Sequence, residues 1–411
     1  MGKQKIFFTL SLATLGASFT NTHAQITTNQ LTGGVNTITT AVPFLLISPD
    51  SRGGGMADIG AASSPDANSI HWNASKLAFS EKKFGLGMSY TPWLRNLVPD
   101  INLAYLSGYY KVKEDQAIGA SLRYFSLGDI TFTDVVGNTI GQFKPNEFAF
   151  DVAYARRFSP NWSGGMAMRY IYSNLTGGIN VQGSATKAGK SVAADVNAYY
   201  TNSDIKVGGK KSTVAAGLNI SNIGAKISYT TKTDRDFIPI NMRLGGRLTI
   251  NLDDYNSFSV LADLNKLLVP TPPVYDVDSA GQIINNPDGS AKILKGEDPN
   301  RGIAEGIFGS FNDAPGGFKE EMKEVNYSIG LEYWYDNQFA VRAGYFNEDE
   351  TKGNRKYFTF GLGVKYNVFG LDFAYLVPTK QRNNPLSNTL RFTLLFDFDA
   401  FKGEKEEAPA E

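Results

Sequence analysis

Apolar and polar residues alternate along this chain from residue 84 almost to the C-terminus. In one segment the large apolar residues are Val325, Tyr327, Ile329, Leu331 and Tyr333, and polar or small residues fill the positions between them. A period of two places each set on its own face of a β-strand. The pattern predicts 14 strands, most of them about ten to twelve residues long, which is the length that a tilted strand needs to cross a membrane. The predicted strands are 84–93, 101–112, 116–127, 147–158, 162–175, 191–202, 212–222, 240–252, 257–267, 325–336, 338–347, 356–367, 370–377 and 389–399.

The connections between these strands differ in length according to their order. They are short after even-numbered strands, with the moderate connection 203–211 as the exception, and mostly longer after odd-numbered strands, up to the 57 residues 268–324. A soluble β-sandwich has no reason for this sorting, whereas an outer-membrane barrel has short periplasmic turns and long extracellular loops. The chain is therefore predicted to be all-β, with a 14-stranded antiparallel transmembrane β-barrel over residues 80–402.

The stretch 47–79 interrupts the alternation, because it is rich in Gly, Ala, Ser and Asp and poor in large apolar residues. Its glycines at 53–55 permit close backbone packing. A solvated linker is the alternative, but Met56, Ile59, Ile70 and Trp72 favour a packed segment. We predict that residues 25–79 form an N-terminal segment and a plug inside the barrel. The residues expected to characterise this plug are Arg52, Gly53, Gly54, Gly55, Met56, Asp58, His71, Trp72 and Asn73.

The two ends of the chain indicate export. Residues 1–5 carry two lysines, residues 6–19 are apolar or small, and Thr22 and Ala24 precede Gln25 at the spacing of a cleavage site. These features predict a secretory signal peptide over residues 1–24. Later in the chain no apolar run approaches the length of a transmembrane helix. An even number of strands returns the acidic tail 403–411 to the periplasm, so the protein is expected in the outer membrane.

Composition narrows the possible chemistry. The 40 Lys and Arg residues balance the 40 Asp and Glu residues, which disfavours nucleic acid as a partner. The absence of cysteine excludes disulfides and thiolate metal sites. Residues 276–281 resemble the start of a calcium loop, but Ala280 and Pro287 stand where ligands are needed. No phosphate-binding or dinucleotide motif is found, so we expect neither a cofactor nor a metal site.

Charged residues on the inward positions of the strands have both signs. Either they line a path for a substrate, or they form paired networks that hold the plug, and the balance of signs favours the networks. The inward residues are Glu147, Asp151, Arg169, Asp195, Arg243, Arg247, Asp263, Glu332, Arg342, Asp372 and Arg391.

The plug stretch and the barrel together resemble the PorV family of the type IX secretion system, within the wider family of FadL-like barrels. The resemblance covers the mature chain, and its specific segments are SRGGGMADIG (51–60), SPDANS (64–69) and HWNASKLA (71–78). The wider family usually has Asn-Pro-Ala at Asn73-Ala74. The resemblance implies a non-enzymatic protein that binds cargo with C-terminal sorting domains at a large outer-membrane translocon barrel. It would deliver this cargo to a surface sortase, or attachment, complex, in contact with membrane lipid.

Two other functions stay open at this point. One is a FadL-like transporter of hydrophobic small molecules, and the other is a lipid A deacylase that would use His71 as its base. A packed histidine in the plug is the simpler interpretation of His71. For the carrier, the expected partner-binding residues lie in the long connection 268–324 and are Ile303, Ile307, Phe308 and Phe311. They could line one face of a short helix, although this connection could instead fold back over the mouth of the barrel.

Overall fold

The computed structural model describes residues 35–398, apart from 95–97, 99, 134–135, 179–184, 231–234 and 381–383. The predicted signal peptide, the first ten residues of the predicted N-terminal segment and the predicted acidic tail lie outside this part of the chain. No described helix is long and apolar enough to cross a membrane.

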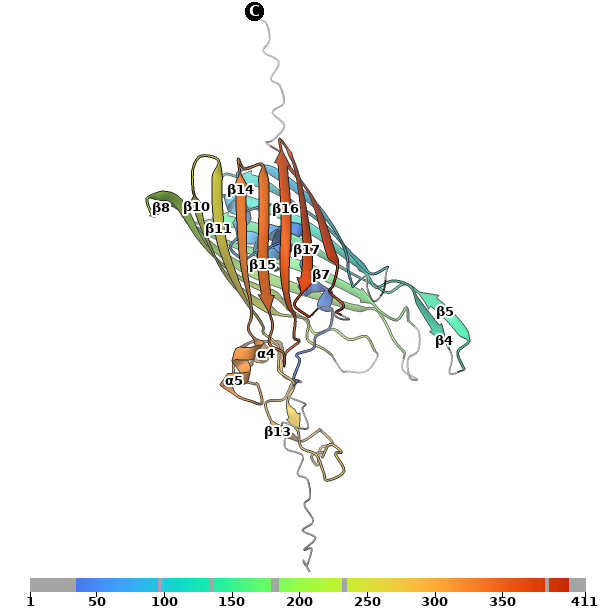
Figure 1. The fold of residues 1–411 in the computed structure, drawn as a ribbon. Coiled ribbons are helices and arrows are strands. Elements are labelled where there is room, and N and C mark those ends of the chain that lie inside the picture. The colour runs from blue at the N-terminus through green and yellow to red at the C-terminus, as the bar shows by residue number, and fades with distance from the viewer. Residues whose placement is uncertain are drawn as a thin grey trace, which may run out of the picture. The chain divides into compact units, whose positions relative to one another are not determined.

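Fourteen antiparallel strands close into a barrel (Figure 1). Neighbours in the chain are neighbours in the sheet, and β1 closes the barrel on β18, with Phe84 opposite Phe398 and Tyr90 opposite Phe392. The predicted fold class is therefore confirmed for the barrel. Its strands are β1 (Phe84–Pro92), β2 (Asn102–Lys113), β3 (Gln116–Ser126), β6 (Asn146–Arg157), β7 (Trp162–Asn174), β8 (Gly189–Val207), β9 (Lys210–Gly224), β10 (Asn241–Asn251), β11 (Asn256–Leu267), β14 (Asn326–Tyr335), β15 (Phe339–Asn347), β16 (Lys356–Tyr366), β17 (Phe369–Pro378) and β18 (Thr389–Phe398).

The sequence predicts one moderate connection, residues 203–211, among the short connections after even-numbered strands, and this prediction is wrong. Residues 203–211 are not a moderate loop, because β8 and β9 continue through them to a two-residue turn at Gly208 and Gly209. Both glycines have positive φ, 57° and 78°, as tight hairpin turns require. The connections at the end of the barrel that carries this turn therefore all have two to four residues, whereas those at the other end have eight or more. We call these the short-turn end and the long-connection end.

The two faces of the wall follow the predicted alternation. On β14, Ile329 and Leu331 are exposed on the outer surface, while Ser328 and Glu332 are buried in the interior. The same holds on β18 for Phe392 and Leu394 against Arg391 and Thr393. An apolar outer surface with a polar interior is the arrangement of a membrane-spanning barrel. Ile240 departs from the prediction, because it precedes β10 and is buried in an apolar cluster with residues from the N-terminal stretch.

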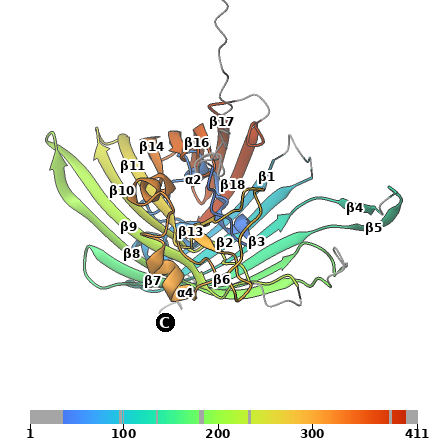
Figure 2. The same ribbon diagram turned by 90° about the horizontal axis from the view of Figure 1, so that it is seen from below.

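The long-connection end carries the irregular structure. The connection 268–324 lies over the barrel opening, and Figure 2 shows α4 and β13 in front of it. A separate hairpin extends to the side of the barrel (Figure 1). The elements at this end are β4 (Ile130–Thr133) and β5 (Thr139–Phe143) in that hairpin, and β12 (Val274–Tyr275), β13 (Ile293–Lys295), α4 (Ile303–Gly309), α5 (Phe318–Glu321) and η3 (Met322–Glu324) in the long connection.

The glycine-rich stretch lies inside the barrel. Its short helices are η1 (Pro43–Leu46), α2 (Ser51–Gly54), α3 (Ser69–Trp72) and η2 (Ala74–Phe79). Helix α2 contacts β16, β17 and β18, and η2 contacts β3, β6, β7 and β8, so the stretch meets widely separated parts of the wall. The chain enters from the long-connection end, where the Asn36 N–H donates to the Thr351 carbonyl. The described residues before 45 thus lie at the mouth and in the lumen.

Candidate functional site

Helix α2 is joined to the wall by a buried chain of charges. Arg52 donates from Nε and Nη2 to the two carboxylate oxygens of Glu332 on β14, at 2.9 and 3.0 Å. Glu332 also accepts from Arg342 Nε at 2.9 Å, and Arg342 Nη1 donates to Asp372 at 2.6 Å. Bidentate guanidinium–carboxylate pairs of this kind fix both distance and orientation. Arg52 further pairs with Asp66 at 3.1 Å, so one side chain links two parts of the stretch to the barrel.

A second set of contacts holds the turn after α2. Asp58 accepts from Arg391 Nη1 at 2.7 Å and from the Tyr357 hydroxyl at 2.6 Å. The Ala57 N–H donates to Thr359 Oγ1, and the Ser51 N–H donates to Thr393 Oγ1, both at 2.8 Å. Burial would raise the Asp58 pKa, but the Arg391 charge and the hydrogen bonds from Tyr357 and Arg391 outweigh it and lower this pKa. The carboxylate therefore stays ionised and the ion pair is maintained.

The wall also satisfies backbone groups of the stretch directly. Asp263 on β11 accepts from the N–H groups of Gly60 and Ala61 at 2.9 and 3.1 Å. Lys76 is fully buried and donates to the Gly60 carbonyl at 2.7 Å. Buried backbone groups without partners are costly. An irregular segment can therefore lie in the lumen only because inward polar side chains replace the hydrogen bonds of water.

The predicted plug residues His71, Trp72 and Asn73 lie together at the end of α3. Trp72 Nε1 donates to Asp50 at 2.6 Å, and the Arg243 guanidinium lies 4.4 Å from the Trp72 ring centre. Asn73 Nδ2 donates to the Ala61 and Ala198 carbonyls, at 3.1 and 2.9 Å. These contacts join the end of α3 to the stretch before it and to β8.

His71 is buried beside Trp72, and its Nδ1 accepts from Arg123 Nη2 at 2.7 Å. Burial first, and then the charges of Arg123 and Arg243, lower its pKa well below the usual value. Among the described residues Nε2 has no partner within hydrogen-bond distance. The ring nitrogen that could act as a base thus accepts from a guanidinium, and no hydroxyl group of the described residues is hydrogen-bonded to it.

Glycines allow the backbone of the stretch to approach the wall. A Cβ at Gly217 on β9 would lie 2.0 Å from the Ala61 carbonyl oxygen, and one at Gly344 on β15 would lie 2.5 Å from the Met56 carbonyl carbon. Within the stretch, a Cβ at Gly60 would meet the Trp72 ring at 2.1 Å. Real side chains do not tolerate these distances, so glycine is needed where the two backbones meet. A Cβ at Gly53 or Gly54 would also come too close, to the Trp72 ring and to the Arg391 side chain, whereas a Cβ at Gly55 would lie 3.1 Å from the Gly361 Cα.

Paired networks account for most of the inward charges, as predicted. Away from the α2 contacts, Arg169 pairs with Asp151 at 2.6 Å and with Asp195 at 3.1 Å, all three buried between β6, β7 and β8. Glu147 accepts from Ser173 and has no cationic partner in the described part of the chain. The charges thus bind one another and the enclosed stretch.

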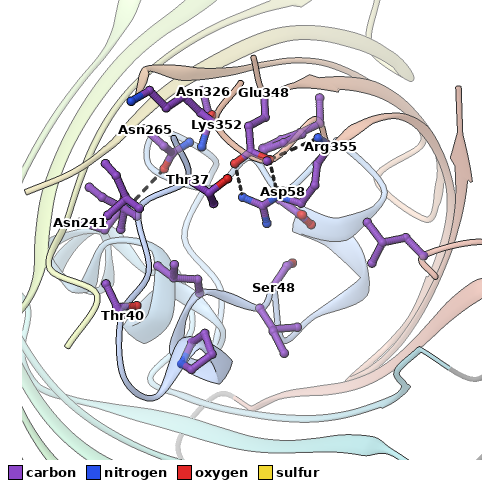
Figure 3. Close-up of a pocket in the computed structure, with 18 of the residues that line it drawn as sticks. Thr37, Thr40, Ser48, Asp58, Asn241, Asn265, Asn326, Glu348, Lys352 and Arg355 are labelled. Atoms are coloured by element: carbon purple, nitrogen blue, oxygen red, sulfur yellow. Dashed lines mark hydrogen bonds and ion pairs between the residues drawn. The ribbon is translucent and has the colours of Figure 1, made fainter. Parts of the chain in front are cut away.

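A cavity of about 430 Å³ remains above the stretch at the long-connection end (Figure 3). Ile38, Leu46 and Ile47 line one side of it, and Phe346 and Leu376 line the wall. Its polar rim includes the paired side chains of Glu348 and Arg355, with Lys352 nearby (Figure 3). The cavity is large enough for a small organic molecule, but the buried stretch lies beneath it.

A compact ion cluster fixes the long connection over the mouth. Glu324 accepts from Lys266 at 2.6 Å, from Lys352 at 3.0 Å and from the Thr271 hydroxyl at 2.7 Å. Glu321 and Glu320 add further pairs to Lys266 and Lys352. Three carboxylates around two ammonium groups thus tie the end of the long connection to the end of β11 and to the connection after β15.

The four predicted partner-binding residues do not share one exposed face. Ile303 and Ile307 are half-buried and pack against the apolar cluster of the N-terminal stretch, so they anchor α4. Phe308 and Phe311 point to solvent, with 79% and 47% of their surfaces exposed. Part of this connection therefore folds back over the mouth of the barrel, while Phe308 and Phe311 stay exposed.

Two further exposed apolar side chains were not predicted. Phe318 is 75% exposed and Met322 is 55% exposed, on α5 and η3. The only sequence signal for them is a large apolar residue after Gly316 and Gly317 in an otherwise charged segment.

The calcium-like segment is a surface turn. Asp276 pairs with Lys292 at 2.8 Å, and Asp278 accepts from the N–H groups of Ala280 and Gln282. The chain itself therefore uses these carboxylates. Among the described residues no cluster of three or more His, Cys, Asp or Glu side chains could hold a metal ion.

Comparison with known proteins identifies the family. The family model described as "Type IX secretion system protein PorV" matches residues 30–274, whereas no curated protein matches the sequence. Among solved structures, the chain is similar to the Ralstonia pickettii toluene transporter TbuX, with 12% identity, a TM-score of 0.47 and coverage of 86% of this chain and 100% of that one.

The Pseudomonas putida toluene transporter TodX gives 13% identity, a TM-score of 0.45 and coverage of 84% and 98%. A Pseudomonas aeruginosa FadL homologue has 11% identity and a TM-score of 0.41, and the match covers 89% of this chain and 100% of that one. At these identities and TM-scores the three structures carry no argument about function. The family match is different, because it spans more than half of the 411 residues. The chain therefore belongs to the PorV family of type IX secretion system proteins and is an integral β-barrel of the outer membrane.

Proposed function

We propose that this protein is a non-enzymatic carrier of the type IX secretion system. In this role it binds cargo with C-terminal sorting domains at the large outer-membrane translocon barrel and delivers that cargo to the surface attachment complex. Membership of the PorV family supports a role in type IX secretion. The observation that carries the finer proposal is the exposed surface of the long connection, which carries the large apolar side chains of Phe308, Phe311, Phe318 and Met322.

This surface has the features of a protein contact. Large apolar side chains exposed beyond the membrane mark interaction sites, and aromatic anchors dominate binding energies. The helix that presents Phe308 is immobilised by Ile303 and Ile307 beneath it. The Glu324–Lys266–Lys352 cluster fixes the end of the same connection. A surface held in place before binding loses little conformational entropy when a partner docks.

We further propose that the stretch 47–79 acts as a permanent plug. Arg52 and Asp58 form ion pairs with the wall, and the backbone of the stretch meets glycines of β9 and β15. A carrier that works through its outer surface needs no passage through the lumen. The plug then has a simple purpose, since it fills a barrel of this size and keeps the membrane sealed.

The test is to replace Phe308 and Phe311 together with Ser in the full chain. Both side chains are exposed and lie outside the strands, so the barrel should fold and reach the outer membrane normally. Co-purification with the translocon and display of cargo at the cell surface should both fall at least tenfold, because this is the effect expected when one strong aromatic anchor is lost.

A matched control replaces Leu294 and Ile283, two exposed apolar residues of the same connection, with Ser. This control should secrete and bind partners like the unaltered protein. Wild-type binding and secretion by the Phe308→Ser, Phe311→Ser variant would show that the connection is only a lid.

The second candidate is a transporter of hydrophobic small molecules, and the cavity of about 430 Å³ is the observation that favours it. Transport would require the paired plug to leave the lumen. Replacing Leu376, which lines the cavity, with Trp would fill part of this space. Uptake of a hydrophobic nutrient should then fall if the protein is a transporter, while a carrier should secrete cargo unchanged. His71 gives no support to a deacylase, because Arg123 occupies its Nδ1.

A further inference from the structure

The β8–β9 hairpin is longer than the other hairpins at the short-turn end. The pairing of β8 with β7 ends at Tyr200, opposite Trp162, and the pairing of β9 with β10 ends at Ser212, opposite Ile250. Beyond these points Thr201 still exchanges hydrogen bonds with Asn161 of the β6–β7 turn, and the remaining residues of the two strands pair with each other as far as the turn at Gly208 and Gly209. No requirement of barrel closure explains this extension.

The extension leans outward from the wall. The pairing of β8 with β9 is irregular between Asn202 and Ile205, where the hairpin leaves the barrel. Irregularities of this kind bend a strand. Both views show the end of the hairpin directed away from the barrel axis (Figures 1 and 2). Its tip therefore lies beside the barrel, not above the lumen.

Aromatic residues mark the level of the membrane surface at the base of this extension. The Trp162 and Tyr200 rings lie 5.0 Å apart, and Trp162 is 53% exposed on the outer wall. Exposed Trp and Tyr side chains form girdles at the boundary between hydrocarbon and headgroups. A hairpin that leaves the wall at this girdle and leans outward extends over the headgroups of the surrounding lipid.

The tip is basic. Lys206, Lys210 and Lys211 are exposed around the turn, and Lys206 lies directly opposite Lys211 in the ladder. Like charges at directly opposed positions destabilise a hairpin. No carboxylate of the described residues forms an ion pair with these lysines. Asp253 in the β10–β11 turn has a lowered pKa mainly through the hydrogen bond from the Tyr255 N–H, and the Lys210 charge contributes only a minor part.

We propose that the tip of the β8–β9 hairpin binds the headgroups of anionic phospholipids in the leaflet at the short-turn end. The phosphate oxygens would lie between Lys206 and Lys211 and relieve their repulsion. Basic clusters beside a membrane attract anionic lipids by this mechanism. The contact would fix the rotation and height of the barrel in the bilayer without involving the lumen or the long connection.

Because the chain has no cysteine, a single introduced cysteine can be labelled specifically, and this allows a direct test. A fluorophore is attached to Val207→Cys, and the full-length protein is placed in nanodiscs that contain headgroup-quencher-labelled phosphatidylglycerol or phosphatidylcholine at equal mole fraction. Quenching should be stronger with phosphatidylglycerol at low salt and should approach that of phosphatidylcholine near 1 M salt, where screening is short-ranged.

The decisive comparison uses Lys206→Gln, Lys210→Gln and Lys211→Gln together in the labelled protein. The preference for phosphatidylglycerol should disappear, because each lysine contributes up to about fivefold to the affinity for the anionic lipid. A control changes Lys187, Lys295 and Lys319 to Gln, which removes the same charge from exposed positions at the opposite end, and it should keep the preference.

Heat-modifiable migration in gels verifies that each variant is a folded barrel. An unchanged preference in the hairpin variant would overturn the proposal. Absence of quenching by both lipids would also overturn it, since the tip would then lie away from the bilayer and the lysines would be available to a soluble acidic partner.

Discussion

Two irregular segments of this barrel, the stretch 47–79 and the connection 268–324, are built by opposite rules. The first is buried almost throughout, and the barrel wall supplies ion-pair partners for Arg52 and Asp58 and hydrogen-bond partners for part of its backbone. The second is fixed at one end by the Glu324 cluster and beneath α4 by apolar contacts, while its outer surface presents Phe308 and Phe318 to solvent. The difference separates a segment that fills the barrel from a segment that is available to partners.

The physical origin of this difference lies in side-chain size. Gly60 and Ala61 bring backbone N–H groups close enough to Asp263 for hydrogen bonds, and no large side chain intervenes. The long connection has prolines at 270, 272 and 273 and aromatic residues on α4 and α5, which cannot enter a lumen already occupied. Small residues therefore predict close packing inside, and aromatic residues in a long loop predict contacts outside.

The largest expected effect comes from breaking the buried charge chain. Glu332→Gln would leave Arg52 and Arg342 without the carboxylate that both share. Uncompensated buried charges cost about 3–5 kcal/mol, so the free energy of unfolding in detergent micelles should fall by about that amount. The matched change Glu297→Gln, on an exposed carboxylate of the long connection, should alter it by less than about 0.5 kcal/mol. Equal stability of the two variants would remove the distinction between the segments.

Adding one methyl group on the inner wall should have a smaller effect. Gly217→Ala places a Cβ 2.0 Å from the Ala61 carbonyl oxygen, so the enclosed stretch must shift. Overpacking of this kind costs about 1–3 kcal/mol, measured as a lower midpoint of urea unfolding. Gly246→Ala on the neighbouring strand is the control, because its Cβ would meet no atom within 4 Å. If both variants unfold at the wild-type midpoint, the stretch is not in tight contact with the wall.

The smallest effect concerns pH and His71. Burial and the nearby Arg123 lower the pKa of folded His71 well below the 6.5 of an ordinary histidine. The unfolded chain then binds a proton that the folded chain does not, so His71 contributes stability above pH 6.5 that is lost as the pH falls. This contribution should decrease by about 1.4 kcal/mol between pH 7.5 and 5.5.

The measurement for His71 is the free energy of unfolding as a function of pH, compared between the parent and His71→Asn. The difference between the two profiles isolates His71, because the other groups titrate in both proteins. The parent should lose stability more steeply than the variant over this interval. Parallel profiles would mean that His71 is solvated, and that the end of α3 is not buried as described.

The sequence was a good guide to the barrel and a poorer one to the irregular segments. Alternation identified the strands because each strand has one apolar and one polar face, as Leu331 and Glu332 show. It missed the extension of β8 and β9, because residues beyond the wall have no buried face to impose a pattern. Only the turn glycines at 208 and 209 could have indicated it.

The contacts of the candidate site required the structure. Arg52, Asp58 and Trp72 could be singled out from the stretch, but their partners Glu332, Arg391 and Asp50 are set by how the stretch folds in the lumen. The grouping of Ile307 with Phe308 was misleading for a related reason. Adjacent residues of a helix point in different directions, so one anchors α4 and the other is exposed.

We propose that the protein acts through its mouth and outer surface while the lumen stays closed. Ser51 Oγ on α2 and Thr393 Oγ1 on β18 lie 3.0 Å apart, so Ser51→Cys with Thr393→Cys can form a disulfide that locks the stretch to the wall. The chain has no other cysteine to interfere. The measurement is surface display of cargo by cells carrying this variant, with the bond oxidised and then reduced. We expect equal display in both states, and display that falls on oxidation and recovers on reduction would show that the stretch must move.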